Sequence, residues 1–184
     1  AVYNIIANVE GDNIMFSRYL DFATKTWTKQ KSGSINYIIS PNKNVNKQEI
    51  DNQRNEVHKL CDFFKIAPIS ITYYSCVNPK ELFEIKGFDY HPMMYVDKSG
   101  GLADLGNIIF SGNNSEIYTH EIVHIYTTTI YTEIDKFLDE GIATYIAGSG
   151  KQDYKWHREK LRKFIAENPE HDFKNHIDPY ERFY

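Results

Sequence analysis

The sequence predicts an α+β fold, with a mixed α/β lobe over residues 1–114 and a mainly helical lobe over residues 115–184. Two short runs of β-branched and aromatic residues, 35–39 and 69–74, have the composition of strands. The residues between them, 46–64, carry apolar side chains at the spacing of an amphipathic helix. After residue 115, helical patterns follow one another with no strand between them. Because no linker or repeat interrupts the chain, we expect one continuous domain over residues 1–184.

The first lobe is expected to alternate helices with strands. Residues 1–9 indicate a short strand or a lead-in segment, and residues 12–29 indicate a helix, since their apolar side chains recur at helical spacing. Asn46 is the predicted N-cap of the helix that follows, and Asn78 begins a helical turn that ends near residue 85. The expected strands of this lobe are 35–39, 69–74, 93–96 and 102–110.

Three helices are expected in the second lobe. Ser115 is the predicted N-cap of the first, 115–131. This helix is rich in β-branched residues, which disfavour helices, so only burial inside the domain would stabilise it. The second helix runs over 134–147 and the third over 151–168. The third is expected to turn four apolar side chains inward: Trp156, Leu161, Phe164 and Ile165.

Charge and hydropathy exclude several classes of protein. The net charge is -4 and the sequence pI is about 6.0, so neither nucleic acid nor an anionic membrane is an expected partner. No apolar run is long enough to predict a transmembrane helix. The first residue is Ala1 rather than Met, which a removed export signal or a shortened chain would both explain. We expect an exported protein (periplasmic, cell-surface or secreted), with a cytoplasmic location as the alternative.

The chain has two cysteines, Cys61 and Cys76. They can form one disulfide, which would fit an exported protein, or remain two buried thiols. The sequence favours neither alternative.

The sequence His120-Glu121-Ile122-Val123-His124 lies within the expected 115–131 helix. Residues four apart share one face of a helix, so His120 and His124 can direct ring nitrogens to one point, as a tetrahedral zinc ion requires. Glu121 lies about 100° round the helix, where its carboxylate can take a proton from a metal-bound water. The alternative is an amphipathic helix that carries two surface histidines.

A second motif, Phe137-Leu138-Asp139-Glu140-Gly141-Ile142-Ala143, follows sixteen residues after His124 when counted to Glu140. A catalytic zinc typically takes three protein ligands, and His-His-Glu is one of the standard sets. The small residues at 141 and 143 would let this helix pack closely on the histidine helix. The alternative is an acid near a helix N-terminus, which the helix dipole favours. After H-E-x-x-H, the interpretation as a ligand is favoured.

Together the two motifs, H-E-x-x-H and F-L-x-E-G-x-A, resemble the gluzincin zinc peptidases of the peptidase-MA-like clan, which includes thermolysin-like enzymes. The resemblance covers residues 120–145, with a looser likeness through 102–110. It implies a zincin-like fold, in which a twisted mixed sheet with helices precedes an active-site helix and a glutamate helix. Metzincins match poorly, because Thr127 and Ile130 stand where that group has glycine and histidine.

The resemblance also implies the roles of individual residues. One Zn²⁺ per chain would be held by His120, His124 and Glu140, with Glu121 as general base and then general acid. An oxyanion-stabilising tyrosine or histidine would follow the glutamate helix. The candidates for this donor are Tyr145, Tyr154, His157, His171, His176 and Tyr180. The acids near enough in sequence to hold a ligating histidine are Asp139, Glu133 and Asp104.

The resemblance further places residues 102–110 at the sheet edge above the metal, where free backbone groups would pair with an extended substrate. The alternative is an internal hairpin strand. The backbone groups concerned belong to Ala103, Asp104, Leu105, Gly106 and Asn107.

The expected function is zinc-dependent hydrolysis of peptide bonds in a peptide or protein substrate. Residues 102–110 contain no G-x-M-E-N sequence, with which aminopeptidases hold a free α-amine, so an endopeptidase is favoured. The alternative is a catalytically weak or inactive peptide-binding protein on a zincin fold, against which an intact Glu121 argues. A structural domain with a chance motif would require two unrelated coincidences.

Overall fold

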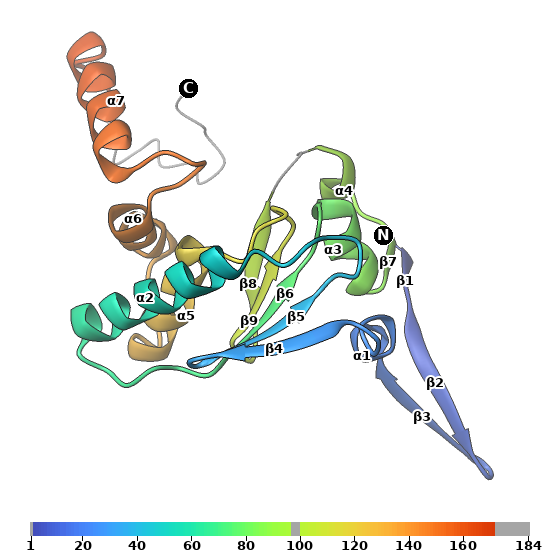
Figure 1. Cartoon of the computed structure of the whole chain (residues 1–184). Coiled ribbons are helices and arrows are strands. Elements are labelled where there is room, and N and C mark those ends of the chain that lie inside the picture. The colour runs from blue at the N-terminus through green and yellow to red at the C-terminus, as the bar shows by residue number, and fades with distance from the viewer. Residues whose placement is uncertain (1, 97–99, 172–184) are drawn as a thin grey trace.

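The protein is described by a computed structural model over residues 2–96 and 100–171 (Figure 1). Five strands form one mixed sheet in the order β4-β5-β6-β9-β8. The central strands β5, β6 and β9 are parallel, and the outer strands β4 and β8 are antiparallel to their neighbours. The bounds of these strands are β4 Thr28–Ser32, β5 Ile35–Ile39, β6 Ile71–Ser75, β8 Gly101–Asp104 and β9 Ile108–Ser111.

Helices cover both faces of this sheet (Figure 1). On one face α2 (Lys47–Phe64) and α5 (Thr119–Ile130) enclose the larger core, which includes Tyr37 and Tyr73 of the sheet and Tyr126 of α5. On the other face α1 (Tyr19–Ala23) and α3 (Pro79–Ile85) lie over a smaller core. Successive side chains of a strand point to opposite faces, so the same strands supply both cores. Three helices, α5, α6 and α7, form the C-terminal region, as the α+β prediction requires.

Two helices begin at the asparagine that was predicted to start them. The side chain of Asn46 accepts a hydrogen bond from the Glu49 N–H at 3.2 Å, and α2 begins there. The Asn78 side chain likewise accepts from the N–H of Glu81 at 2.9 Å, which begins α3. In α6 (Lys136–Ala147) the cap is Asp135, one residue after the predicted start.

Helix α5 is buried, as its β-branched composition requires. Ile122, Val123 and Ile125 lie in the core. Two of its three consecutive threonines donate their hydroxyls to carbonyls one turn back, Thr128 to His124 and Thr129 to Ile125, each at 2.6 Å, and the Thr127 hydroxyl donates to Asp139 of α6. The hydroxyls are thereby satisfied, and tertiary packing overrides poor propensity.

The predicted N-cap Ser115 is wrong, because α5 begins at Thr119 with no side-chain cap. The Ser115 hydroxyl and the Glu116 N–H both donate to Glu49 Oε2 on α2, each at 2.7 Å. The Tyr118 N–H donates to Gln53 Oε1 of the same helix at 2.7 Å. These bonds to α2 replace the bonds that a longer α5 would have made.

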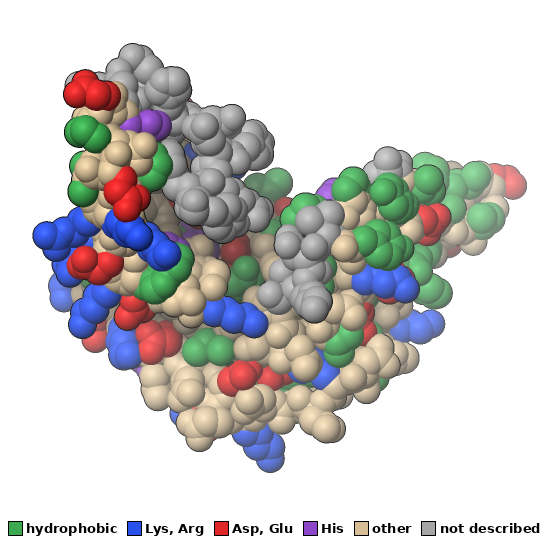
Figure 2. All heavy atoms as spheres, turned by 90° about the horizontal axis from the view of Figure 1, so that it is seen from above, with side chains coloured by type: hydrophobic (Ala, Val, Ile, Leu, Met, Phe, Trp, Pro, Cys, Tyr) green, Lys and Arg blue, Asp and Glu red, His purple; other side chains and the backbone are tan. Residues whose placement is uncertain are grey.

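The predicted helix over 12–29 is also wrong. A hairpin of β2 (Ile5–Glu10) and β3 (Asn13–Arg18) turns at Gly11, whose φ of +62° suits a tight two-residue turn. Only α1 is helical in this stretch, and β4 follows it. The hairpin extends away from the sheet in Figure 1, and hydrophobic side chains gather on that arm in Figure 2. A strand within residues 1–9 is confirmed by β2 and by β1 (Val2–Tyr3), which pairs with β7 (Phe88–Tyr90).

Two predicted strands differ in the structure. Residues 93–96 form the short helix α4 (Met93–Val96). The single strand expected over 102–110 is the hairpin β8–β9, because Gly106 and Asn107 take positive φ values of 78° and 58° and reverse the chain.

Helix α7 (Tyr154–Glu167) does not turn its apolar side chains inward as expected. It extends away from the sheet in Figure 1, and none of its residues is buried. Cys61 and Cys76 are both free thiols, since Cys61 packs against one core and Cys76 lies in the other. Among the helices of the described residues, none has the length and apolarity to cross a membrane.

Candidate metal centre

His120 and His124 lie one turn apart on α5, with ring centroids 5.0 Å apart. Both side chains are almost buried, at 13% and 12% exposure. One ring nitrogen of each histidine and one carboxylate oxygen of Glu121 all lie within 4.8 Å of one another. These three residues therefore form a group that could hold a metal ion.

Each histidine is held through its Nδ1 atom. His120 Nδ1 lies 2.6 Å from the carbonyl oxygen of Gly148, the residue that ends α6. His124 Nδ1 lies 2.8 Å from Asp139 Oδ2, and the other Asp139 oxygen accepts the Thr127 hydroxyl at 2.5 Å. A proton on each Nδ1 leaves Nε2 as the atom that can bind a metal.

Of the acids considered from the sequence, Asp139 thus contacts a histidine. Glu133 lies exposed in the segment between α5 and α6. Asp104 forms an ion pair with Lys86 instead, and that pair holds the pKa of the Asp104 carboxyl below its usual value although burial opposes the shift.

Glu140 faces the free nitrogens of both histidines. Its Oε2 lies 3.3 Å from His120 Nε2 and its Oε1 lies 3.7 Å from His124 Nε2. Glu121 approaches from the sheet side, where its Oε2 accepts the backbone N–H of Ala103 in β8 at 2.8 Å. Two carboxylates therefore border the two histidines, one from α6 and one from α5.

The charges of this group are strongly coupled. Burial lowers the pKa of His120, but hydrogen bonds to Glu140 and to the Gly148 carbonyl outweigh it, and the pKa is raised. The hydrogen bond from His120 lowers the pKa of Glu140 although partial burial opposes the shift. Burial raises the pKa of Glu121, and the two histidines oppose that shift. The neighbouring acceptors thus favour the protonated, positively charged form of His120 in the metal-free protein.

The histidines open into a cleft of about 1480 Å³. It is lined by β8, the β8–β9 turn, one side of α5, one side of α6 and the loop 147–153. Figure 2 shows the molecule hollowed between its two ends. The cleft is large enough for a polymeric ligand to pass the histidines.

The predicted edge strand is confirmed only in part. Ala103 and Asp104 belong to β8, which is an edge of the sheet, whereas Leu105, Gly106 and Asn107 form the turn to β9. All five residues line the cleft. The strand just before α5, β9, is internal, because β8 covers it.

The candidate oxyanion donors lie elsewhere. Tyr145 and Tyr154 pack edge to face with centroids 4.9 Å apart, and both line a separate hollow beside the end of α2. His157 Nε2 lies 2.9 Å from the carbonyl of Ser149. His171 packs edge to face on the ring of Phe164, and His176 and Tyr180 lie outside the described residues. The structure thus does not bring Tyr145, Tyr154 or His157 into the lining of the cleft.

Tyr118 is a cleft residue that sequence reasoning missed. Its ring packs against Gly101 of β8, where a Cβ atom would collide with it. Burial, and then the nearby Glu121 carboxylate, raise the pKa of its hydroxyl to about 12, so Tyr118 keeps its proton at neutral pH. Its place two residues before His120 was the one available signal.

Sequence reasoning also missed the contact of His120 with the Gly148 carbonyl, since a backbone acceptor cannot be recognised from residue types.

Comparisons with protein-family models, curated proteins and solved structures return no match to this chain.

Proposed function

We propose that the chain is a zinc-dependent peptidase on a zincin-like fold, similar to the gluzincins, and that residues 1–184 form its catalytic domain. The observation that carries this proposal is the orientation of the two histidines. Their Nδ1 atoms are engaged by Gly148 and Asp139, and their Nε2 atoms converge beside two carboxylates. Nitrogen donors held in this way, with a carboxylate opposite, fit the donor set of a catalytic zinc ion.

Glu140 is proposed as the third ligand and Glu121 as the general base. One oxygen of Glu140 faces each Nε2 atom, and its side chain is 52% exposed toward the cleft. Glu121 is instead held by the backbone of β8 at 2.8 Å. The edge strand thereby fixes the carboxylate that must receive a proton, while α6 supplies the carboxylate that binds the metal.

Each residue of the site has a separate role in the proposed hydrolysis. When bound, a zinc ion supplies Lewis-acid chemistry, which lowers the pKa of water and polarises a carbonyl group. Glu121 takes the proton of the attacking water and delivers it to the departing amine. Burial, which raises its pKa, suits a carboxyl group that must both accept and donate a proton near neutral pH. The protonated Tyr118 hydroxyl is the side-chain donor we propose for charge that develops on the substrate oxygen.

The substrate is proposed to be an extended peptide that lies along β8, with endopeptidase rather than aminopeptidase cleavage. The Ala103 N–H is taken by Glu121, so pairing would use other outward backbone groups of that edge. Export of the protein remains a prediction from the sequence.

Metal content tests the site. Mass spectrometry of the purified protein should find about one zinc per chain, and Glu140→Ala should lose it or bind it far more weakly. Glu133→Ala, which removes an exposed acid of the same type, is the matched control. Zinc retained in full by Glu140→Ala would remove that residue from the site.

Activity tests the mechanism. Glu121→Gln should keep zinc and lose at least about a hundredfold in the cleavage rate of a peptide library. Activity that survives within tenfold would show that Glu121 is not the base. A wild-type protein that binds zinc and peptides but cleaves none of them would support the alternative of a binding protein.

A further inference from the structure

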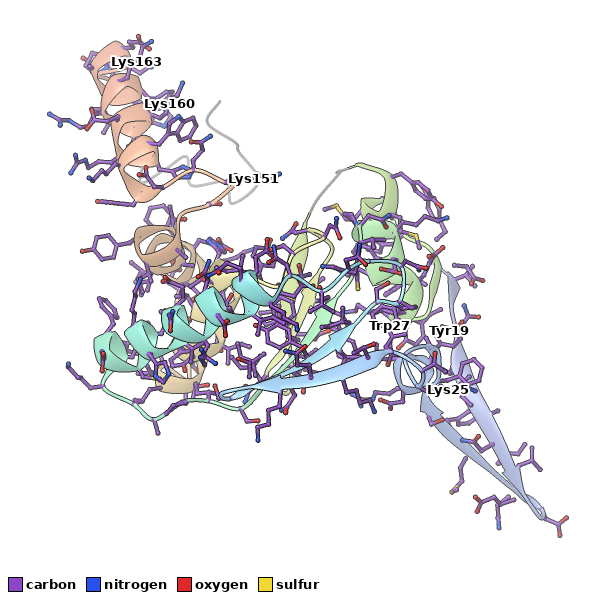
Figure 3. All side chains as sticks on the ribbon, in the orientation of Figure 1. Tyr19, Lys25, Trp27, Lys151, Lys160 and Lys163 are labelled. Atoms are coloured by element: carbon purple, nitrogen blue, oxygen red, sulfur yellow. The ribbon has the colours of Figure 1, made fainter. Side chains whose placement is uncertain are left out.

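Helix α7 extends away from the sheet and from the other described helices except α6, which it contacts. Its 14 residues extend beyond α6, and none of them is buried. Figure 3 shows Lys160 and Lys163 on this projecting helix and Lys151 on the loop that leads to it. A helix with no buried residue receives little stability from packing, so its apolar side chains are available to a partner.

The apolar side chains of α7 form a stripe. At 100° per residue, Tyr154, Leu161 and Ile165 fall within about 40° of one another on the helix surface. Their exposed fractions are 38%, 47% and 45%. Tyr154 also packs on Tyr145 of α6, so Leu161 and Ile165, one turn apart, form the part of the stripe most accessible to a partner.

Positive charge lies beside this stripe. Five cationic residues and two acidic ones give α7 a net charge of +3, whereas the whole chain carries -4. On the helix surface, with Tyr154 at 0°, Arg158, Arg162 and Lys155 lie at about 40–100° and Lys163 and Lys160 at about 180–240°. The five cations therefore start beside the stripe and cover roughly 200° of the helix surface. Lys160 also lies over the ring of Trp156, 5.3 Å from its centroid, and Trp156 is 43% exposed. The basic character is therefore local and hidden by the net charge of the chain.

We propose that α7 docks on the surface of an anionic lipid bilayer. An apolar stripe on a helix whose remaining surface is mainly cationic lets the stripe enter the acyl region while the charges stay among anionic headgroups. The long apolar stems of lysine and arginine let their charges reach the headgroups from a shallowly inserted helix. An acidic groove on a protein is the competing partner, but it would match cations on one side of the helix, whereas the cations of α7 are spread over roughly 200° of its surface.

Docking through α7 would also determine where the cleft lies relative to the membrane. Helix α7 follows directly after the loop 147–153, which lines the cleft beside the histidines. A molecule held through α7 would keep that opening close to the lipid surface. The docking itself does not depend on the proposed peptidase activity.

Vesicle flotation with the full chain tests the proposal. Wild-type protein should float with phosphatidylcholine vesicles that contain phosphatidylglycerol, and binding should weaken as salt is raised. Pure phosphatidylcholine vesicles should bind at least tenfold more weakly. Because each basic residue near an anionic surface contributes about a fivefold change in affinity, Lys155→Gln/Lys160→Gln should bind about 25-fold more weakly.

Two further variants complete the test. Lys29→Gln/Lys31→Gln removes the same charge from exposed positions on β4 and should bind like the wild type. Leu161→Asn should bind at least tenfold more weakly, with its helix content checked by circular dichroism. The proposal is overturned if the wild type does not float, if both lipid compositions bind equally, or if the β4 variant loses as much as the α7 variant. Wild-type protein that binds soluble polyglutamate but no vesicles would assign α7 to an acidic protein instead.

Discussion

The substitution Asp139→Asn tests how far the metal centre depends on the residue that holds His124. Asp139 accepts two hydrogen bonds, from His124 Nδ1 at 2.8 Å and from the Thr127 hydroxyl at 2.5 Å. Asparagine has nearly the same shape but a single acceptor oxygen. It can accept one of these two bonds and must turn its NH₂ group toward the other donor.

The expected loss in zinc affinity follows from two contributions. A charge-assisted hydrogen bond is roughly twice as strong as a neutral one, a difference of about 1 kcal/mol. The unsatisfied donor adds about 1–2 kcal/mol, since Asp139 and His124 are only 16% and 12% exposed and water cannot readily replace the bond. The sum, about 2–3 kcal/mol, corresponds to an affinity for zinc that is weaker by about 30- to 150-fold.

Competition with a chromophoric chelator at neutral pH would measure this affinity. Glu133→Gln removes the same charge from an exposed position in the segment before α6 and should leave the affinity unchanged. If Asp139→Asn binds zinc within twofold of the wild type, the Asp139 contact does not orient His124, and binding of zinc through Nε2 does not depend on a proton held at Nδ1.

Three other predictions concern stability. Lys43→Met should lower the free energy of unfolding in urea by about 3–5 kcal/mol, because it leaves the buried Glu116 carboxylate, 2.7 Å from Lys43 Nζ, unpaired; a loss below 1 kcal/mol would contradict this. In metal-free protein, the raised pKa of His120 stabilises the folded state below about pH 6.5. This stability is lost as the pH rises through the pKa that His120 has in the folded protein. The lowered pKa of Glu140 contributes stability above about pH 4.3 that is lost on acidification. Urea titrations with a chelator should therefore find maximal stability near pH 5–6, and a steady rise from pH 6 to 8 would refute the assignment. Gly101→Ala should lower the thermal midpoint by several degrees, because its Cβ collides with a tyrosine ring and a backbone carbonyl; an unchanged midpoint in calorimetry would show that β8 shifts freely.

The sequence predicted best those elements that carry their own local signals. Helix α2 has an asparagine cap and a long apolar stripe, and β5 and β6 are runs of β-branched and aromatic residues. The motif residues on α5 and α6 also meet in space, because spacing on a helix fixes which side chains share a face. The turns and loops between these elements were harder to predict.

The failures have a common physical cause. In residues 12–29 the apolar side chains of β3, α1 and β4 happen to recur at helical intervals, and only the backbone of Gly11 shows where the chain turns. The β8–β9 hairpin likewise depends on positive φ values at Gly106 and Asn107 inside an apolar run. The oxyanion candidates were proposed without knowing the direction of α7, which depends on how α6 ends rather than on the composition of α7.

The composition of α5 bears on the order in which the protein assembles. A segment so rich in isoleucine, valine and threonine has little tendency to become helical alone, so His120 and His124 stay unaligned until α2 and the sheet are in place. We therefore expect α5 to gain hydrogen-exchange protection late in folding, after α2. Zinc would bind only after the core has formed, because its ligands are not aligned before then. Its binding free energy would therefore stabilise the product of the last folding step.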